Sequence, residues 1–291
     1  MSLSLEIVDN LCGFSLAKYS TWFYYKPDNL LLDVGEGVSV TMRNMIFGIN
    51  TVLISHGHAD HISGLPGLLS SRASSMGDTE KAINIYYPKA DRNIAKIYRY
   101  IKETIGKVPY EIVWKEISPG DRLPLSGNRY LEAFASKHID NTLSLGYKIA
   151  EERNRLKACY RDIPQKELIQ IIQSKGKKEI TETYTQNLLC FSGDSMPLDQ
   201  ETVQSSEVLL HDATFLKLED REENTHATVE EVIQLAKASN VSALCLFHLS
   251  ARYRYQEIIE GIQQYLAKYE MKIPVFLLYS FYSPLSFKKI Q

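Results

Sequence analysis

The stretch Ser55-His56-Gly57-His58-Ala59-Asp60-His61 is the most informative part of this sequence for both its chemistry and its fold. It follows an apolar segment at residues 51–54 that reads as a strand, and it precedes Gly64-Leu65-Pro66-Gly67, which opens a predicted helix. Three imidazoles and one carboxylate in one short turn are ligands that zinc and similar divalent cations accept. Histidines packed singly in a core are a poor alternative, because burying this many polar groups without a shared partner is costly. The stretch therefore predicts a metal site.

Further ligands must come from other parts of the chain, because one turn cannot complete two metal sites. Along an extended segment His56 and His58 lie on one side, while Asp60 and His61 turn toward another, which suits two ions side by side. Three more candidates lie where a predicted strand gives way to a loop: His138, Asp194 and His248. A lone residue of this kind is more often a cap, but together with the first stretch the three indicate a shared metal centre.

The composition is that of an ordinary globular protein. The chain has 291 residues, of which 44% are hydrophobic and 23% are charged. It has no apolar run near the roughly 18 residues that a membrane-spanning helix needs, and Met1–Glu6 lack the basic start and apolar stretch of a signal peptide. We therefore expect a cytoplasmic protein without a membrane partner. The formal net charge of −2 by itself argues against a nucleic-acid partner.

The hydrophobic pattern alternates between short apolar strands and amphipathic helices, which predicts an α/β layered fold. Candidate helices span residues 90–104, 228–239 and 255–268, and Thr228 with Glu231 forms a capping box at the start of the second. The expected strands lie at residues 30–33, 51–55, 83–87, 188–192, 208–211, 243–247 and 275–279. We expect one catalytic domain over residues 1–291.

The segment Arg153–Lys178 differs from the rest of the chain, since it has eight basic and two acidic residues and a net charge of +6. The remainder therefore carries about −8. Pro164 and Gly176 bracket a predicted helix inside the segment. We interpret residues 151–185 as an inserted basic arm that serves as a substrate-binding exosite, although a solvated surface helix explains the charge alone equally well.

The four cysteines are far apart in the sequence and form no Cys-x-x-Cys pair, which argues against both a thiolate zinc site and a disulfide framework. We expect buried structural thiols at these positions, which are Cys12, Cys159, Cys190 and Cys245.

The motifs together resemble the metallo-β-lactamase superfamily. The order His-x-His-x-Asp-His, His138, Asp194, His248 is similar to its ligand series, and residues 33–37 (Asp-Val-Gly-Glu-Gly) match the acidic turn that precedes it in many members. Residues 211–215 (His-Asp-Ala-Thr-Phe) and 226–228 (His-Ala-Thr) are similar to motifs of the ribonuclease Z family, endonucleases that trim the 3′ end of precursor tRNA. The resemblance runs from about residue 14 to residue 253 and is closest to a short bacterial subgroup with a compact basic arm.

The resemblance implies a four-layer αββα sandwich with the metal site at one edge of the sheets. It also implies two Zn²⁺ per subunit, with Mn²⁺ as an alternative, precursor tRNA as the substrate and a homodimer in which one subunit's arm serves the other's site.

The resemblance further implies a role for each site residue. The metal ligands are His56, His58 and His138 for one ion, Asp60, His61 and His248 for the other, and Asp194 as the bridge. Asp60 also orients or deprotonates the attacking water, His226 protonates the leaving 3′-oxygen, and Asp212 holds His226 in the useful tautomer. The family usually has Glu where this chain has Asp212, so we expect a looser contact or a compensating backbone shift. Alternatively, His226 only neighbours the helix cap at Thr228, and His211 is expected to have a structural role.

Two groups of residues are candidates for binding RNA. Arg252 and Ser250 contact phosphate or, alternatively, only pack at the rim of the site. Arg153, Arg155 and Lys157 contact the tRNA backbone from the arm.

Two other functions remain alternatives. The first is a metallo-β-lactamase-fold hydrolase of small phosphodiesters or other esters, which needs much the same metal site. The second is a binding protein on an inactive fold, which the complete ligand set disfavours. A redox diiron protein is disfavoured because such members commonly replace the second histidine of the stretch, here His58, with Glu.

Overall fold

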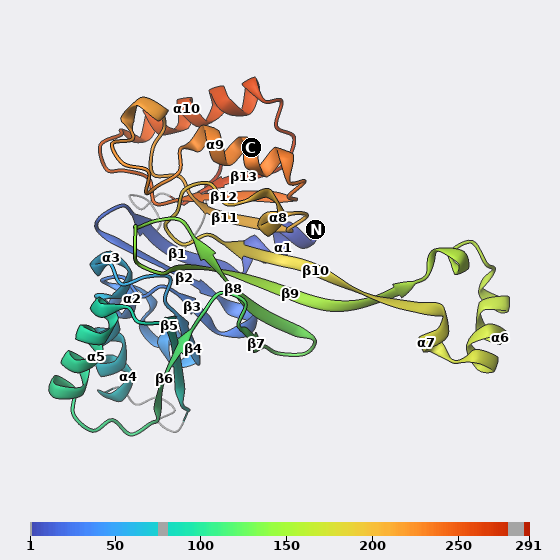
Figure 1. Ribbon diagram of the computed structural model, residues 1–291, viewed down its shortest axis with the longest axis horizontal. Coiled ribbons are helices and arrows are strands. Elements are labelled where there is room, and N and C mark those ends of the chain that lie inside the picture. Colours follow the sequence, from blue (N-terminus) through green and yellow to red (C-terminus); the bar gives the residue numbers. More distant parts are fainter. Residues whose placement is uncertain (1, 75–80, 279–287) are drawn as a thin grey trace.

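The computed structural model describes residues 2–74, 81–278 and 288–291. Two sheets face each other, and helices cover their outer sides, so the chain has the α/β layers that the sequence predicts, in the αββα order that the resemblance implies (Figure 1). No helix within the described residues is long and apolar enough to cross a membrane.

The first sheet has six strands in the order β1-β2-β3-β4-β5-β6. Helices α2, α4 and α5 pack on its outer face, and α1 packs between the sheets. The bounds are β1 (Leu11–Leu16), β2 (Ser20–Tyr25), β3 (Leu30–Leu32), β4 (Thr51–Leu53), β5 (Ile83–Pro88), β6 (Ile112–Ile117), α1 (Leu3–Asp9), α2 (Val38–Met42), α3 (Ala59–Ile62), α4 (Leu65–Ser74) and α5 (Arg92–Thr104).

The second sheet has eight strands in the order β14-β13-β12-β11-β10-β9-β8-β7. Helices α9 and α10 cover its outer face. The bounds are β7 (Arg122–Pro124), β8 (Arg129–Ser136), β9 (Ser144–Leu156), β10 (Thr181–Phe191), β11 (Val208–Asp212), β12 (Ala243–Phe247), β13 (Val275–Leu277), β14 (Lys288–Lys289), α6 (Gln165–Lys175), α7 (Lys177–Ile180), α8 (Gln200–Val203), α9 (Val229–Ala238) and α10 (Tyr255–Lys268). Short 3-10 helices span Lys26–Asp28, Arg43–Gly48, Ala158–Tyr160 and Leu218–Asp220.

A cluster of three phenylalanines packs between the sheets. The rings of Phe23, Phe191 and Phe247 lie 5.0 to 5.7 Å apart, centre to centre, and all three side chains are fully buried. Phe191 ends β10 and Phe247 ends β12. The strand ends that lead into the predicted metal site are therefore anchored in the buried core between the sheets.

Parallel pairing brings the ends of distant strands to one edge. β3, β4 and β5 are parallel neighbours in the first sheet, and β10, β11 and β12 are parallel neighbours in the second. The carboxyl ends of parallel neighbours lie at the same edge of a sheet. β11 and β12 are buried along their whole length, as expected for parallel strands that are covered on both faces.

Most elements predicted from the sequence are confirmed. α10 has the predicted bounds, and α9 begins after Thr228, whose capping box with Glu231 is present. α6 starts after Pro164 and ends before Gly176. The strand predicted at residues 188–192 is only the end of the much longer β10, and residue 279, the last of the strand predicted at 275–279, lies outside the described residues.

β9 and β10 continue beyond the sheet as a two-stranded ribbon. β8 pairs with β9 only as far as Glu151, whereas β10 pairs with β9 as far as Leu156 opposite Thr181. The ribbon carries α6 and α7 at its tip and projects from the body of the molecule (Figure 1). The expectation of buried thiols is wrong for Cys159, which is exposed at this tip.

Candidate metal centre

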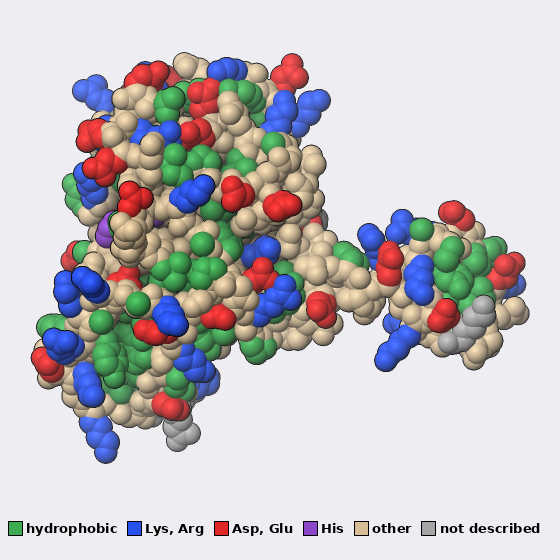
Figure 2. All heavy atoms as spheres, in the orientation of Figure 1, with side chains coloured by type: hydrophobic (Ala, Val, Ile, Leu, Met, Phe, Trp, Pro, Cys, Tyr) green, Lys and Arg blue, Asp and Glu red, His purple; other side chains and the backbone are tan. Residues whose placement is uncertain are grey.

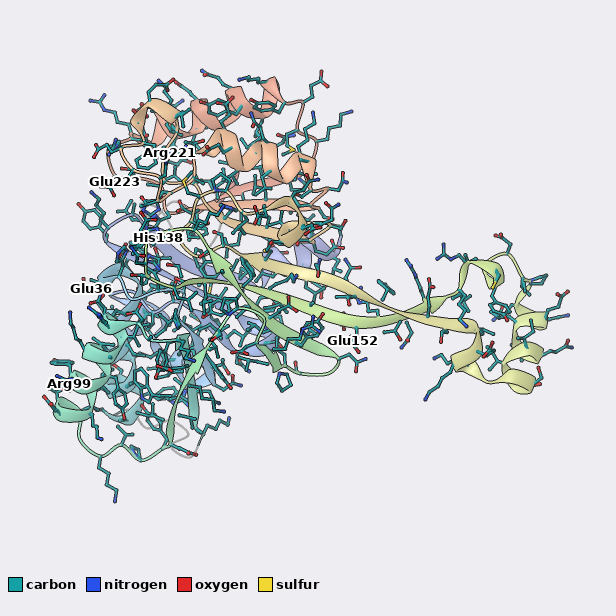
Figure 3. All side chains as sticks on the ribbon, viewed as in Figure 1. Glu36, Arg99, His138, Glu152, Arg221 and Glu223 are labelled. Carbon is teal, nitrogen blue, oxygen red and sulfur yellow. The ribbon has the colours of Figure 1, made fainter. Side chains whose placement is uncertain are left out.

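The predicted ligands meet at the edge where the carboxyl ends of the parallel strands lie. The stretch from His56 to His61 follows β4 and runs into α3, while His138 follows β8, Asp194 follows β10 and His248 follows β12. Figure 3 shows His138 where the two halves of the molecule meet, on the side away from the arm.

One oxygen of Asp194 lies among four histidines. Asp194 Oδ2 is 3.1 Å from His61 Nε2, 3.2 Å from His248 Nε2, 3.9 Å from His56 Nε2 and 4.0 Å from His138 Nε2. The ligand atoms fall into two groups that share Asp194, and within each group they lie within 4.8 Å of one another. The groups are His56, His58, His138 and Asp194, and Asp60, His61, Asp194 and His248. The structure thus brings together all seven residues that the sequence predicts as ligands.

Asp33 fixes the tautomers of two histidines in this centre. His61 Nδ1 lies 2.8 Å from Asp33 Oδ2 and donates to it. The hydroxyl of Ser55 also donates to Asp33 Oδ2, so Ser55 Oγ accepts a hydrogen bond from His56 Nδ1, 3.0 Å away. With Nδ1 protonated, each ring keeps an Nε2 lone pair for a cation.

The same logic holds for two histidines from the second sheet. Thr214 Oγ1 donates to Asp212 Oδ1 over 2.7 Å, so it accepts from His248 Nδ1, 2.9 Å away. His138 Nδ1 lies 2.9 Å from the carbonyl oxygen of Thr225 and donates to it. The Nε2 atom of each ring therefore keeps its lone pair for a metal, and His138 Nε2 lies 3.3 Å from Nδ1 of His58, another member of the centre.

The donor set fits a divalent cation. His56 Nε2, His61 Nε2, His248 Nε2 and Asp194 Oδ1 are buried atoms without a hydrogen-bond partner in the structure. The Nε2 lone pairs of His61 and His248 lie 3.1 and 3.2 Å from Asp194 Oδ2. Each lone pair is repelled by the carboxylate unless positive charge lies between the two atoms.

The titration of these residues shows the same demand for positive charge. Burial raises the pKa of Asp194, but the charges of His248 and His61 outweigh burial and hold the pKa well below its usual value. Burial lowers the pKa of His61, but the carboxylates of Asp194 and Asp33 outweigh it and hold the pKa well above its usual value. The pocket therefore attracts a cation. When a metal is not bound, a proton on His61 supplies the positive charge.

Two glycines allow the close approach of the site's loops. A Cβ on Gly57 would lie 2.3 Å from Asp91 Oδ1, so only glycine lets the ligand loop pack on the start of α5. Gly193, next to Asp194, has a φ of 61°, and a Cβ there would lie 2.9 Å from the carbonyl oxygen of Leu145.

A histidine–carboxylate pair stands beside the two ligand groups. His226 Nδ1 lies 2.6 Å from Asp212 Oδ2, so the aspartate reaches His226 although the side chain is one methylene shorter than the family's usual glutamate. The His226 ring lies 5.1 Å from the ring of His248 and 4.7 Å from that of His138, centre to centre. Burial lowers the pKa of His226, but the charge and hydrogen bond of Asp212 outweigh it and raise the pKa to about 9.

The neighbouring motif residues have structural contacts. The N-cap of α9 is Thr228, so His226 does not cap this helix. His211 is fully buried, and its ring nitrogens contact the carbonyl of Asp212 at 2.7 Å and the amide of Leu198 at 3.3 Å, as a structural role requires.

The predicted phosphate contacts near the site lie at its rim. Arg252 and Ser250 line a cavity of about 680 Å³ together with His226 and His248. The guanidinium of Arg252 stacks 5.3 Å from the ring centre of Phe215 and donates to the carbonyl of Asp220 at 3.0 Å.

The predicted arm residues lie on the ribbon, away from the metal centre (Figure 1). Arg153 pairs with Glu151 at 2.5 Å, and Arg155 pairs with Glu182 at 2.7 Å, while Lys157 is half-buried. Residues 151–185 include eight basic and six acidic residues, so the net charge of the arm is +2, against +6 for its central part. Figure 2 shows both signs of charge on this lobe.

Sequence reasoning missed several partners of the ligands. Thr214 and Asp33 belong to quoted motifs, so their presence was a signal, although their contacts were not foreseen. The carbonyl of Thr225 and the amide of Lys18, which donates to Asp60 Oδ2 over 3.1 Å, are backbone groups that carry no sequence signal.

The fold and site define a metal-dependent hydrolase of the β-lactamase superfamily, and the model of the beta-lactamase superfamily domain matches residues 29–160. The chain is 31% identical to ribonuclease Z of Methanosarcina acetivorans over 77% of this chain and 79% of that protein. It is 30% identical to ribonuclease Z of Listeria welshimeri over 77% and 78% of the two chains. This chain belongs to the ribonuclease Z family.

Solved structures agree with the fold. The metallo-beta-lactamase fold protein YhfI from Bacillus subtilis superposes with a TM-score of 0.63 at 16% identity, over 93% of this chain and 97% of that one. The short form of human tRNase Z superposes with a TM-score of 0.61 at 20% identity, over 83% and 93% of the two chains.

Replacing Asp33 with Asn should weaken zinc binding about 10- to 100-fold, because His61 and His56 lose the acceptor that sets their tautomers. Competition with a chromophoric chelator measures this affinity, and circular dichroism at saturating zinc checks the fold. The exposed Asp9→Asn is the matched control, and equal zinc affinity of all three proteins would contradict the assignment.

Proposed function

We propose that this protein is a zinc-dependent endoribonuclease that removes the 3′ trailer of precursor tRNA. The observation that carries this proposal is the His226–Asp212 pair, which stands directly beside the two ligand groups. The thiolate of a thioester leaves readily without a proton, whereas the 3′-oxygen of an RNA chain needs a proton as it leaves. The names of the relatives, ribonuclease Z, and of the structural neighbour, tRNase Z, support the same substrate.

We assign two zinc ions to the two ligand groups, with Asp194 shared. Divalent cations bound there would neutralise charge on the phosphodiester and would lower the pKa of the attacking water. The side chains that would hold them are His56, His58 and His138 for one ion and Asp60, His61 and His248 for the other.

The chain's own residues position and move the protons. The neighbouring rings of His248 and His61 outweigh burial and lower the pKa of Asp60 to about 2, so Asp60 stays ionised and accepts a hydrogen bond from water at working pH. His226, with a pKa of about 9, is protonated at neutral pH. Because Asp212 holds Nδ1, the proton on Nε2 of His226 is the one available to the leaving 3′-oxygen.

We further propose that the protein acts in the cytoplasm as a homodimer, in which the arm over residues 151–185 of one subunit binds the tRNA that the other subunit cleaves. A-form RNA is recognised through its shape and phosphates, which suits an exosite set apart from the cut.

The proposed activity is tested by mapping the 3′ end of the product from precursor tRNAs with and without an encoded CCA. We expect one cut at the base of the trailer that leaves a 3′-hydroxyl on the tRNA and depends on added zinc. Hydrolysis of bis-p-nitrophenyl phosphate without any cut in the precursor would instead favour a small-phosphodiester hydrolase.

His226→Ala should lower kcat on precursor tRNA by roughly 10²- to 10⁴-fold, because the leaving oxygen loses its proton donor. On bis-p-nitrophenyl phosphate the loss should be far smaller, since p-nitrophenolate leaves without a proton. Zinc content, measured by atomic emission, should stay unchanged. An equal loss on both substrates would show that His226 supports the metal centre rather than the leaving group.

Removing the tip of the arm should weaken tRNA binding without changing the chemistry. Leu156 pairs with Thr181, so replacing residues 157–180 with Asn-Gly closes the ribbon with a two-residue turn. We expect KM for precursor tRNA to rise at least about tenfold, while turnover of bis-p-nitrophenyl phosphate stays within about twofold. Equal changes on both substrates would argue against an exosite.

A further inference from the structure

A second cavity adjoins the metal centre on the side of α5. Its volume is about 860 Å³, and it is lined by Gly57 and His58 of the ligand loop and by Lys89, Arg92 and Lys96 at the start of α5. His58 and Ile139 also line the cavity that holds His226 and His248. The first ligand group therefore adjoins both of these cavities, and His138 also lines a third, of about 560 Å³.

This α5 cavity is strongly positive. Lys89, Arg92 and Lys96 are exposed, and none of them forms an ion pair with any residue in the described ranges. Within the described part of the chain, Lys96 Nζ donates only to Asn93 Oδ1, at 3.2 Å. The carboxylate in the lining, Asp91, is buried, and its Oδ1 accepts the backbone N–H groups of Asn93 and Ile94 at 2.8 and 3.0 Å. Three unpaired cations around a concave surface attract a polyanion.

The basic side chains at the start of α5 have a fixed position relative to the metal centre. Asp91 caps α5, and the missing Cβ of Gly57 lets the ligand loop pack directly on that cap. The start of α5 and the ligand loop are therefore joined as one packed unit. A phosphate chain that passes over His58 meets the three cations at a fixed place.

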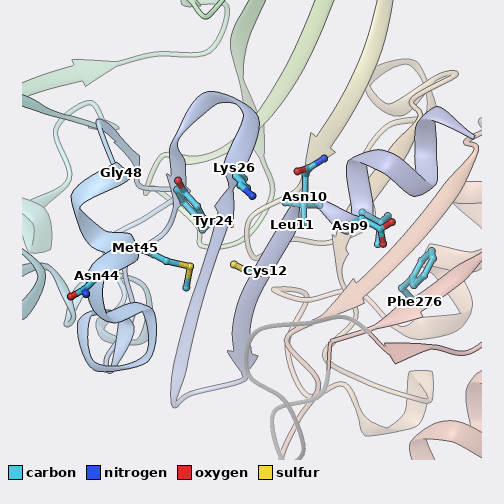
Figure 4. Close-up of a pocket in the computed structure, with 11 residues that line it drawn as sticks. Asp9, Asn10, Leu11, Cys12, Tyr24, Lys26, Asn44, Met45, Gly48 and Phe276 are labelled. Atoms are coloured by element: carbon cyan, nitrogen blue, oxygen red, sulfur yellow. The ribbon is translucent and has the colours of Figure 1, made fainter. Parts of the chain in front are cut away.

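Another cavity of the protein lacks these features. It has a volume of about 540 Å³, is lined by residues such as Cys12, Tyr24, Lys26 and Met45, and contains none of the predicted ligands (Figure 4). A strand that is cut at the metal centre can extend only into cavities that adjoin it.

The position of His226 indicates which cavity holds the tRNA side of the scissile bond. Cleavage that leaves a 3′-hydroxyl on the tRNA makes the 3′-oxygen of the tRNA the leaving atom, so the tRNA side of the bond must lie next to His226. His226 lines the 680 Å³ cavity and not the α5 cavity. The other substituent of the scissile phosphate is the 5′-oxygen of the trailer, which must leave on another side. A third cavity, of about 560 Å³, also reaches the centre at His138, but its lining has one lysine, Lys137, and one aspartate, Asp140. The α5 cavity, with three cations, fits the phosphates of the trailer better.

We propose that the α5 cavity binds the first nucleotides of the 3′ trailer, with their phosphates on Lys89, Arg92 and Lys96. This inference rests on the proposed function and states where the 3′ trailer of that substrate lies. The ligand is a single-stranded RNA segment with a 5′-phosphate after the cut. Contacts to its backbone do not read the base sequence, so trailers of any sequence are accepted.

The test compares precursors that differ only in trailer length, one with one nucleotide and one with eight. In the triple variant Lys89→Ala, Arg92→Ala, Lys96→Ala we expect kcat/KM for the eight-nucleotide trailer to fall roughly tenfold through KM. The value for the one-nucleotide trailer should stay within about twofold, as should hydrolysis of bis-p-nitrophenyl phosphate. The salt dependence of KM for the long trailer should become shallower by about two, at roughly 0.7 per lost phosphate contact on a single strand.

The matched control is Arg99→Ala, Lys102→Ala, Lys107→Ala, which removes three exposed positive charges at the far end of α5 and beyond it. Arg99 lies farther along the helix, on the side away from His138 (Figure 3). This control should leave both precursors unchanged. An equal loss for both trailer lengths, or an equal loss in the control, would overturn the proposal.

Binding of the two products separates this proposal from the proposed function. Fluorescence anisotropy of a 5′-phosphorylated eight-nucleotide RNA should show affinity reduced roughly tenfold in the triple variant, whereas a tRNA that ends at the cut should bind both proteins equally. A loss of tRNA affinity instead would reverse the orientation and overturn the proposal. Absence of cleavage by the unaltered protein would refute the proposed function, whatever the oligonucleotide does.

Discussion

The structure depends on one buried carboxylate, Asp194, whose Oδ2 lies among nitrogens of four histidines. A buried carboxylate is costly unless positive charge or hydrogen bonds compensate it. Here the compensation comes from side chains on two sheets, each oriented by a further partner: Asp33, Ser55, Thr214 or a backbone carbonyl. The site is therefore a connected hydrogen-bond network. Its outer groups hold the Nδ1 protons and so leave the Nε2 nitrogens available to a metal.

Asp212 links this network to the group proposed to act on the leaving oxygen. One of its oxygens accepts from Thr214, which orients His248, and the other accepts from His226. A single fully buried side chain thus sets the tautomer of a proposed ligand and that of the proposed acid. Removing Asp212 would disturb metal binding by His248 and proton donation by His226 together. A substitution at His226 itself therefore separates the two roles better.

The sequence predicted the α/β alternation, the cap of α9 and the first turn of ligands because those signals are local, whereas His138, Asp194 and His248 were joined to that turn by their places at strand ends and by the family resemblance. Thr228 and Glu231 are three residues apart, and the residues from His56 to His61 lie in one turn. The length of β9 and β10 could not be predicted, because beyond Glu151 the ribbon has no sheet neighbour and hence no one-sided apolar alternation. The contact between Gly57 and Asp91 joins segments far apart in sequence, so only the folded chain reveals that α5 and the ligand loop form one unit.

The two ligand groups draw side chains from both sheets, since the residues from His56 to His61 follow a strand of the first and the others follow strands of the second. A cation held there acts as a cross-link between the halves of the sandwich. Because such a cation binds the native state only, it stabilises folding by about 4 kcal/mol when its free concentration is roughly a thousand times its dissociation constant. That is a large fraction of the 5–15 kcal/mol typical of folded domains. The folding equilibrium of this protein and the availability of metal are consequently coupled, so metal scarcity reduces the amount of folded protein as well as its activity.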